Sequence, residues 1–375
     1  MTTATATRKR KSTGITLPAK TLEQALKDVS KAVPTRPAKP VLACVRIGSG
    51  TLTATNLELQ IEVEIDYHGE TLLLPHARLR AILAEARSEE VTITPDGTSC
   101  VVTAGRGTWR LPVESADAWP EWNHEPLRTL VRVPCDQFAR AVKACVYATD
   151  NDSSRYALGA VLVEVQGVEC SFVAMDGRRL SLVKVEHDQA VDDAFALVPA
   201  HALESISDVA SKNPHDAVQL EASEHEFVAT LPGCVVTARQ IAGRFPRWRD
   251  VLPKKDRAGA IETVVDRDEL IEATRAAAIV TSEQSKGVEF TFSGDGVTLH
   301  GQSSEYGQSD VTIDVVSGGD PVKVKLDPVF VVEWLRGIAT DEGPHITVEL
   351  VDAQSACVLR NGGVYTGVIM PLAND

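Results

Sequence analysis

A recurring pattern of apolar and polar positions divides most of the chain into six similar stretches. In each, a short β-like run is followed by proline or aspartate and then by apolar residues at the fourth and seventh positions beyond it. Because this spacing places both apolar side chains on one face of an α-helix, it predicts six helices, each with a buried face. The stretches start at Pro18, Pro75, Pro134, Pro199, Asp266 and Asp327, and the apolar pairs are Leu22 and Ala25, Leu79 and Ile82, Phe138 and Ala141, Leu203 and Ile206, Leu270 and Ala273, and Val331 and Trp334. Proline suits the first helical turn, where its missing N–H would have no partner, and aspartate caps that end.

Alternating or continuous apolar runs between these helices predict antiparallel strands joined by glycine turns. Strands are expected before the helices at 71–74, 130–133, 195–198 and 322–326, and hairpins at 91–94, 161–165 and 288–292, with turns at Gly97, Gly167 and 294–296. The helix starts are 57 to 67 residues apart, which is too long for an ordinary solenoid repeat. Each stretch is therefore expected to be one helix laid on several strands.

A second periodicity groups the six stretches in pairs. The elements Trp-Pro-Glu-Trp at 119–122 and Phe-Pro-Arg-Trp at 245–248 match each other, and Met370-Pro371 closes the chain, with the three prolines 126 and 125 residues apart. This predicts three α+β domains of one fold, each with two helices packed on about eight antiparallel strands. The expected boundaries are a tail at 1–14 and domains at 15–129, 130–254 and 255–375.

Composition and charge restrict the classes of function that the chain could have. The chain has 375 residues, 43% of them hydrophobic and 24% charged, which is ordinary for a globular protein of several domains. No apolar run is long enough to span a membrane, so a soluble, cytoplasmic protein is expected. The net charge is −14, divided as +1, −4 and −11 among the three thirds of the chain. Proteins that hold nucleic acid by bulk affinity are usually basic, so any DNA contact should come from a local basic lining.

The search for catalytic or metal chemistry finds none. The seven cysteines are scattered without a Cys-x-x-Cys pair and are expected to be reduced and buried, and no phosphate loop, zinc motif or nucleophile elbow occurs. We therefore expect no cofactor and no metal. The basic run Arg8-Lys9-Arg10-Lys11 is interpreted as part of a disordered tail or as an arm that touches nucleic acid.

Cations recur on the predicted helices. Lys20, Lys27 and Lys31 share one face of the first helix, and the others are Arg80, Arg87, Arg140, Lys143, Arg275 and Arg336. Each helix alone could simply have a solvated face. Their recurrence on equivalent helices of an acidic protein favours one collected basic surface.

Five segments carry a family resemblance. They are Arg36-Pro-Ala-Lys-Pro40, Arg155-Tyr156-Ala-Leu158, Met175-Asp176-Gly177-Arg178-Arg179-Leu180, Gly243-Arg-Phe-Pro246-Arg-Trp-Arg-Asp-Val251-Leu-Pro253 and Val368-Ile-Met370-Pro371-Leu372. They resemble the motifs of the bacterial β sliding clamps, the processivity subunits of DNA polymerase III, over about residues 15 to 372. The resemblance implies a non-catalytic, head-to-tail dimeric ring that encircles double-stranded DNA. It also implies partners that carry clamp-binding motifs, among them the DNA polymerase III α subunit and the clamp loader δ subunit.

The resemblance and the basic helices together predict which residues form the functional sites. DNA contact is expected at Lys20, Lys27, Arg36, Arg80, Arg140, Asp152, Arg155 and Tyr156. The dimer interface is expected at Arg106, Trp109, Leu111, Ile279, Val280 and Glu305, with ordinary core packing as the alternative for its apolar members. A cleft for partner peptides is expected at Leu158, Met175, Gly177, Arg178, Arg179, Leu180, Pro246, Val251, Phe330, Met370, Pro371 and Leu372, unless these are core residues at a domain junction.

The chain departs from the family at four positions. Asp152 stands where the family often has Gln, Ala157 where it has an aromatic residue, Arg178 where it commonly has His, and Asp250 where many members have Arg. The departures at Asp152, Ala157 and Asp250 are the basis for one alternative, a clamp paralogue that serves repair, a mobile element or self-resistance. The other alternative, a hydrolytic enzyme on an unrelated repeat fold, would need a paired nucleophile and base, and the sequence offers none.

Overall fold

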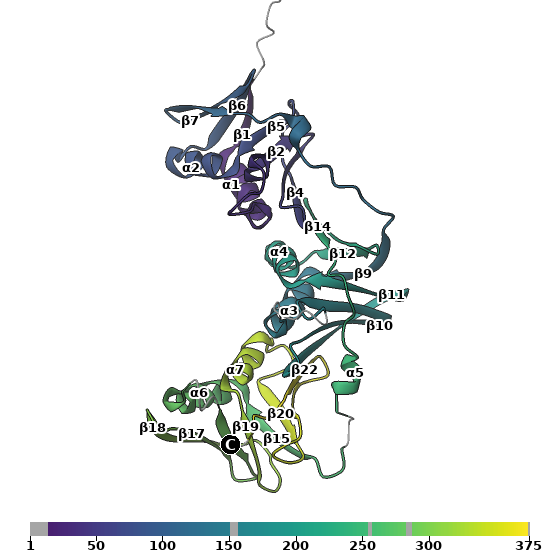
Figure 1. Cartoon of the computed structure of the whole chain (residues 1–375), viewed down its shortest axis with the longest axis vertical. Helices are drawn as coiled ribbons and strands as arrows, with labels where there is room; N and C mark the ends of the chain where they lie inside the picture. The colour runs from purple at the N-terminus through teal and green to yellow at the C-terminus, as the bar shows by residue number, and fades with distance from the viewer. Residues whose placement is uncertain (1–13, 151–156, 254–256, 283–286, 374–375) are drawn as a thin grey trace, which may run out of the picture. The chain divides into compact units, whose positions relative to one another are not determined.

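The computed structural model describes residues 14–150, 157–253, 257–282 and 287–373. The chain divides into two compact units, one of Met1–Pro126 with Val228–Ala238 and the other of Leu127–Phe227 with Arg239–Asp375. Both combine helices with antiparallel sheets, as expected for the α+β class (Figure 1).

The first unit has two helices that pack on each other, α1 (Ala19–Asp28) and α2 (His76–Ala86). One of its sheets has the order β1-β6-β7-β8, with bounds Ile15–Pro18, Glu90–Asp96, Ser99–Ala104 and Gly107–Pro112. The other has the order β5-β2-β3-β4, with bounds Leu72–Pro75, Cys44–Gly48, Thr51–Thr55 and Leu59–Glu64. Strand β14 (Cys234–Arg239), which follows β13 (Glu226–Leu231), pairs with β4 and extends this second sheet.

The second unit contains the helix pairs α3 (Cys135–Cys145) with α4 (Ala200–Ala210) and α6 (Arg267–Ala277) with α7 (Pro328–Gly337). A single helical turn, α5 (Trp248–Val251), was not predicted. A six-stranded sheet has the order β10-β11-β22-β21-β20-β15, with bounds Ala160–Met175, Arg179–Pro199, Tyr365–Ile369, Cys357–Asn361, His345–Leu350 and Ile261–Asp266. A second sheet has the order β18-β17-β16-β19, with bounds Gly307–Ile313, Val297–Ser303, Val288–Phe292 and Val322–Leu326. Strands β9 (Arg128–Pro134) and β12 (Ala217–Ala222) pair with each other.

The pairing of β11 with β22 explains why the second and third predicted domains form one unit. Residues 179–183 of β11 run antiparallel to residues 365–369 of β22, so backbone hydrogen bonds cross the expected domain junction. This continuous sheet holds the last strand of the chain against the middle of the sequence. The exact boundaries 15–129, 130–254 and 255–375 stay a prediction.

All six predicted helices are confirmed. Every one of the twelve apolar residues at their fourth and seventh positions is buried. The four prolines lie at the N-cap, one residue before the helix, rather than inside the first turn. The two aspartates act as predicted, because Asp266 accepts from the N–H of Asp268 and Glu269, and Asp327 accepts from the N–H of Val329.

The predicted turn at Gly167 is wrong. Strand β10 runs through this position for 16 residues and pairs with the 21-residue strand β11, with register shifts on both sides of Gly167. The positive φ of 62° at Gly167 therefore serves a bulge in a long strand instead of a hairpin. Cross-strand pairing on both sides overrides the local turn signal. By contrast, the turns at Gly97 and 294–296 connect strands as predicted.

Candidate functional site

The residues of the predicted cleft come together where β11, β22 and α7 meet in the second unit. Leu180 of β11 pairs with Val368 of β22, and the N–H of Met370 donates to the carbonyl of Arg178 at 2.8 Å. The guanidinium of Arg178 lies over the ring of Phe330, at 5.8 Å from its centroid. Sheet pairing thus assembles segments that are far apart in the sequence.

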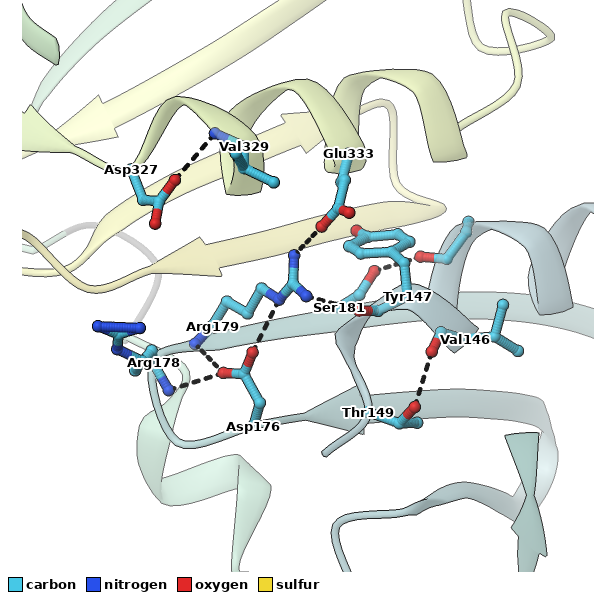
Figure 2. Close-up of polar contacts among 11 residues, drawn as sticks. Val146, Tyr147, Thr149, Asp176, Arg178, Arg179, Ser181, Asp327, Val329 and Glu333 are labelled. Atoms are coloured by element: carbon cyan, nitrogen blue, oxygen red, sulfur yellow. Dashed lines mark hydrogen bonds and ion pairs between the residues drawn. The ribbon is translucent and has the colours of Figure 1, made fainter. Parts of the chain in front are cut away.

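A tight turn at 176–179 presents the two arginines in different directions. One carboxylate oxygen of Asp176 accepts from the N–H of Arg178 at 2.9 Å and of Arg179 at 3.0 Å. Gly177, between Asp176 and Arg178, has a φ of 88°, which residues other than glycine rarely adopt. The turn therefore depends on Asp176 and Gly177, and Figure 2 shows the contacts of Asp176 with Arg178 and Arg179.

Arg179 ties this turn to α7 and to the end of α3. Its Nε donates to Asp176 at 2.9 Å, its Nη1 forms an ion pair with Glu333, and its Nη2 donates to the carbonyl of Tyr147 at 2.6 Å (Figure 2). The guanidinium also lies 4.2 Å from the centroid of the Phe330 ring. Since its donors are engaged and only 11% of the side chain is exposed, Arg179 links the turn at 176–179 firmly to α7 and to Tyr147.

The remaining cleft residues divide into a buried floor and an open rim. Leu158, Met175 and Leu180 belong to a core cluster and are at most 7% exposed. Val251 and Met370 are 37% and 43% exposed. Arg178 is exposed as well, and Pro246, Phe330, Pro371 and Leu372 are half-buried. The buried members of this set are therefore core residues, and the exposed members are the ones open to solvent.

Four of the predicted DNA-contacting cations lie in the first unit. Lys20 and Lys27 project from α1 and Arg80 from α2, and these three side chains and Arg36 are exposed. Lys20 and Lys27 are seven residues apart and so lie on one face of α1. These four cations are open to solvent and available to phosphate groups.

Arg140 is placed differently. It lies on α3, half-buried, and its guanidinium forms ion pairs with Asp136 at 2.9 Å and with Asp341 at 3.5 Å. Its charge is therefore compensated inside the second unit. The other predicted DNA contacts, Asp152, Arg155 and Tyr156, lie outside the described residues.

Strand β8 contains the first half of the predicted dimer interface and is an edge strand of its sheet. The indole of Trp109 lies against Gly107, so a side chain at that position would require the ring to move. Trp109 is half-buried, Leu111 is 8% exposed, and Arg106 is exposed. The strand thus presents unpaired backbone groups beside a partly open aromatic ring.

The second half of that interface lies beside β18, the edge strand of another sheet. Ile279 in the 3₁₀ turn Ala278–Val280 is 78% exposed, Val280 is half-buried, and Glu305 is exposed before β18. Across β17 and β18, His300 Nδ1 lies 2.8 Å from an Asp310 carboxylate oxygen, and this hydrogen bond raises the pKa of His300.

All seven cysteines are free and buried, which confirms the predicted burial. Burial raises the pKa of Cys145, Cys170 and Cys357 to about 12, so these thiols are protonated and poor nucleophiles. Among the described residues, no group of three or more His, Cys, Asp and Glu could hold a metal ion. Within the same part of the chain, no helix has the length and apolar character needed to cross a membrane.

The sequence did not identify Asp176, Tyr147 and Glu333 as partners of Arg179. Asp176 had a local signal, because Asp followed by Gly favours a turn in which the carboxylate binds backbone N–H groups. Glu333 and Tyr147 had none, since their proximity depends on the packing of α7 and α3.

Three family models match consecutive parts of the chain. The N-terminal domain of the DNA polymerase III beta subunit matches residues 13–123, its central domain residues 132–247, and its C-terminal domain residues 249–372.

Curated relatives and a solved structure are similar to this chain over nearly its full length. The chain is 24% identical to the beta sliding clamp of Synechococcus elongatus over 370 residues, covering 94% of this chain and 96% of that protein. It is 23% identical to that of Escherichia coli over 367 residues, covering 92% and 96%. The crystal structure of the DNA polymerase III subunit beta from Pseudomonas aeruginosa has the same fold, with a TM-score of 0.88, 22% identity, and coverage of 96% and 100%.

Proposed function

Because this chain belongs to the DNA polymerase III β subunit family, the bacterial sliding clamps, we propose that two copies close head to tail into a ring around duplex DNA. The match of all three family domains, in order and over almost the whole chain, carries this proposal. The chain is a sliding clamp of DNA polymerase III. It tethers its partners to DNA without catalysing a reaction itself.

Ring closure uses the two free sheet edges. Strand β8 of one copy adds to β18 of the other, which satisfies the backbone groups of both edges. The half-buried Trp109 and the exposed Ile279 supply the apolar contact, and the exposed Arg106 and Glu305 have opposite charges. The nearly neutral first third of one copy thereby meets the −11 last third of the other.

The closed ring holds DNA topologically. A chain with a net charge of −14 is poorly suited to retain DNA by phosphate affinity. A modest lining that includes Lys20, Lys27 and Arg80 is sufficient to centre the duplex and allows sliding. The acidic remainder of the surface disfavours DNA binding elsewhere.

The cleft around Met370 and Phe330 binds short peptide motifs of partner proteins, the polymerase α subunit and the clamp loader δ subunit among them. Support comes from its buried apolar floor, its exposed Met370 and Val251, and the solvent-exposed guanidinium of Arg178. An apolar groove with few polar groups is typical of sites for linear motifs.

Primer extension tests the proposed function. With the host's replicative polymerase and clamp loader on a long primed circle, the wild-type chain should increase product length severalfold. Trp109→Ala should remove the effect, because truncating a buried interface aromatic costs about 2–4 kcal/mol, or about 30- to 1,000-fold in dissociation constant. Sedimentation should show a monomer for this variant and for Val280→Asp, and a dimer for the wild type. A wild-type monomer, or no change in product length, would contradict the proposal.

A further inference from the structure

A second hollow adjoins the predicted cleft in the second unit. It has a volume of about 440 Å³, and its floor is formed by Leu162 of β10, Leu197 and Phe195 of β11, and Trp248 of α5. Leu162 and Leu197 are paired across the two strands, and Leu162, Leu197 and Trp248 are each 5% exposed. Phe195, on the same face of β11, is 58% exposed. A large aromatic side chain is therefore left open to water beside a buried apolar floor.

Three arginines lie at the rim of this hollow, one with its guanidinium in an ion pair and two with exposed side chains. Arg249 stacks on the Trp248 ring at 4.1 Å and forms an ion pair with Glu164 at 2.8 Å. Arg244 and Arg247 also line the hollow and are exposed. Neither has a carboxylate partner for its guanidinium among residues 14–150, 157–253, 257–282 and 287–373. Two cations are thus available to a ligand beside the exposed Phe195.

The hollow is continuous with the predicted cleft. Pro246 belongs to the residues of both, and the core cluster beneath Leu158, Met175 and Leu180 of the cleft also includes Leu162 and Leu197. A peptide seated in the cleft can therefore extend along one apolar surface into the hollow.

We infer that this hollow binds an acidic, aromatic-containing flank of the same partner peptides. The inference rests on the proposed peptide cleft. An aromatic side chain of the flank packs on Phe195 over the apolar floor, and its carboxylates pair with Arg244 and Arg247. Asp250 also lines the hollow and disfavours acidic residues next to it, which restricts where the carboxylates of the flank can bind.

A peptide fits this surface better than single-stranded nucleic acid. Aromatic and arginine side chains together can also bind bases and phosphates. Here, however, the rim also contains Asp250. A phosphate backbone has a charge at every unit, whereas a peptide can place its carboxylates at Arg244 and Arg247 and a neutral residue near Asp250. The apolar floor continues toward a peptide cleft, which a nucleic acid strand would not use.

Fluorescence anisotropy with labelled peptides tests the inference on the full chain. The probes are a bare Gln-Ser-Ser-Leu-Ser-Phe core and the same core extended at either end by Gly-Asp-Phe-Asp or by the neutral Gly-Asn-Phe-Asn. The acidic extension at one end should tighten binding about fivefold to tenfold, and more than the neutral one. Replacing Arg244 and Arg247 together by Gln should abolish the difference between the two extensions. Phe195→Ala should reduce the gain from both, and Arg132→Gln, an exposed control on β9, should change nothing.

The outcomes separate the two proposals. A bare core that fails to bind the wild type overturns the peptide cleft and, with it, the hollow as an extension of that cleft. A core that binds with no gain from either acidic extension, or a gain that survives the double substitution, overturns the hollow alone. A twelve-residue oligothymidylate is added as a competitor. If it displaces the labelled peptide with the acidic extension from the wild type but not from the double variant, the hollow binds nucleic acid, and the inference is overturned.

Discussion

The neighbouring residues Arg178 and Arg179 should lose very different amounts of stability on the same substitution. We expect Arg179→Met to destabilise the second unit by about 2–3 kcal/mol, and Arg178→Met to cost less than about 1 kcal/mol. The two residues have the same charge and are adjacent in sequence, so each serves as the control for the other.

The magnitude for Arg179 follows from what its removal leaves behind. Asp176 is 14% exposed and would lose its only ion-pair partner among the described residues, and the carbonyl of Tyr147 would lose a donor at 2.6 Å. Breaking a buried ion pair typically costs about 3–5 kcal/mol. We expect a smaller loss of stability, about 2–3 kcal/mol, because Glu333 is 41% exposed and because Asp176 keeps its two backbone donors. Among the described residues, the side chain of Arg178 by contrast gives up only its contact with the ring of Phe330.

Urea unfolding followed by tryptophan fluorescence measures the difference, with Trp248 and Trp334 reporting on this unit. At a slope of roughly 3 kcal/mol per molar urea, Arg179→Met should lower the midpoint of its transition by roughly 0.5–1 M. Binding of the core peptide should also weaken in Arg179→Met, since α7 loses its link to the turn at 176–179. An Arg179→Met midpoint within about 0.2 M of wild type would refute the bracing role, and equal losses in both variants would refute the distinction between the two arginines.

Three further predictions concern the cleft and the β18 edge. Met370→Ala combined with Leu372→Ala should abolish binding of a Gln-x-x-Leu-x-Phe peptide in anisotropy and leave the sedimenting mass unchanged; undiminished binding would remove this cleft from the account. Asp250→Arg should increase affinity about fivefold for a peptide with an acidic residue beside that position, and an unchanged affinity would contradict it. The raised pKa of His300 means that its pair with Asp310 adds stability that is fully present below the unfolded-state pKa and lost as the pH rises through the higher folded-state value. Asp310→Asn should lower the His300 pKa in an NMR titration, and an unchanged titration would rule out this pair as its cause.

Local features of the fold were predictable from the sequence because their signals are local. The helix that begins after Asp266 was predicted by a capping residue and by Leu270 and Ala273, all within one short stretch, and the structure confirms it. The turn at Gly167 was predicted by the same kind of signal and is wrong. There the outcome depended on pairing with β11, which a local signal does not contain.

The sequence selected the residues of the proposed peptide cleft but did not show what each of them contacts. Family motifs selected Arg178, Arg179 and Met370, but they did not distinguish an exposed guanidinium from one that is bound on several sides. That distinction depends on Glu333 and on the register of β11 with β22, both of which bring distant segments together. The hollow beside Phe195 had no sequence signal, because an apolar residue in a predicted strand is expected to be buried unless the packing around it is known.

Retention on circular and linear DNA tests the topological ring most directly. The chain is loaded on nicked circular DNA, the salt concentration is raised to weaken phosphate contacts, and half of the sample is then linearised. Because the chain carries a charge of −14, we expect it to stay on the circles through the salt jump and to leave the linear molecules through their ends. Equal loss from circular and linear DNA at moderate salt would contradict the ring.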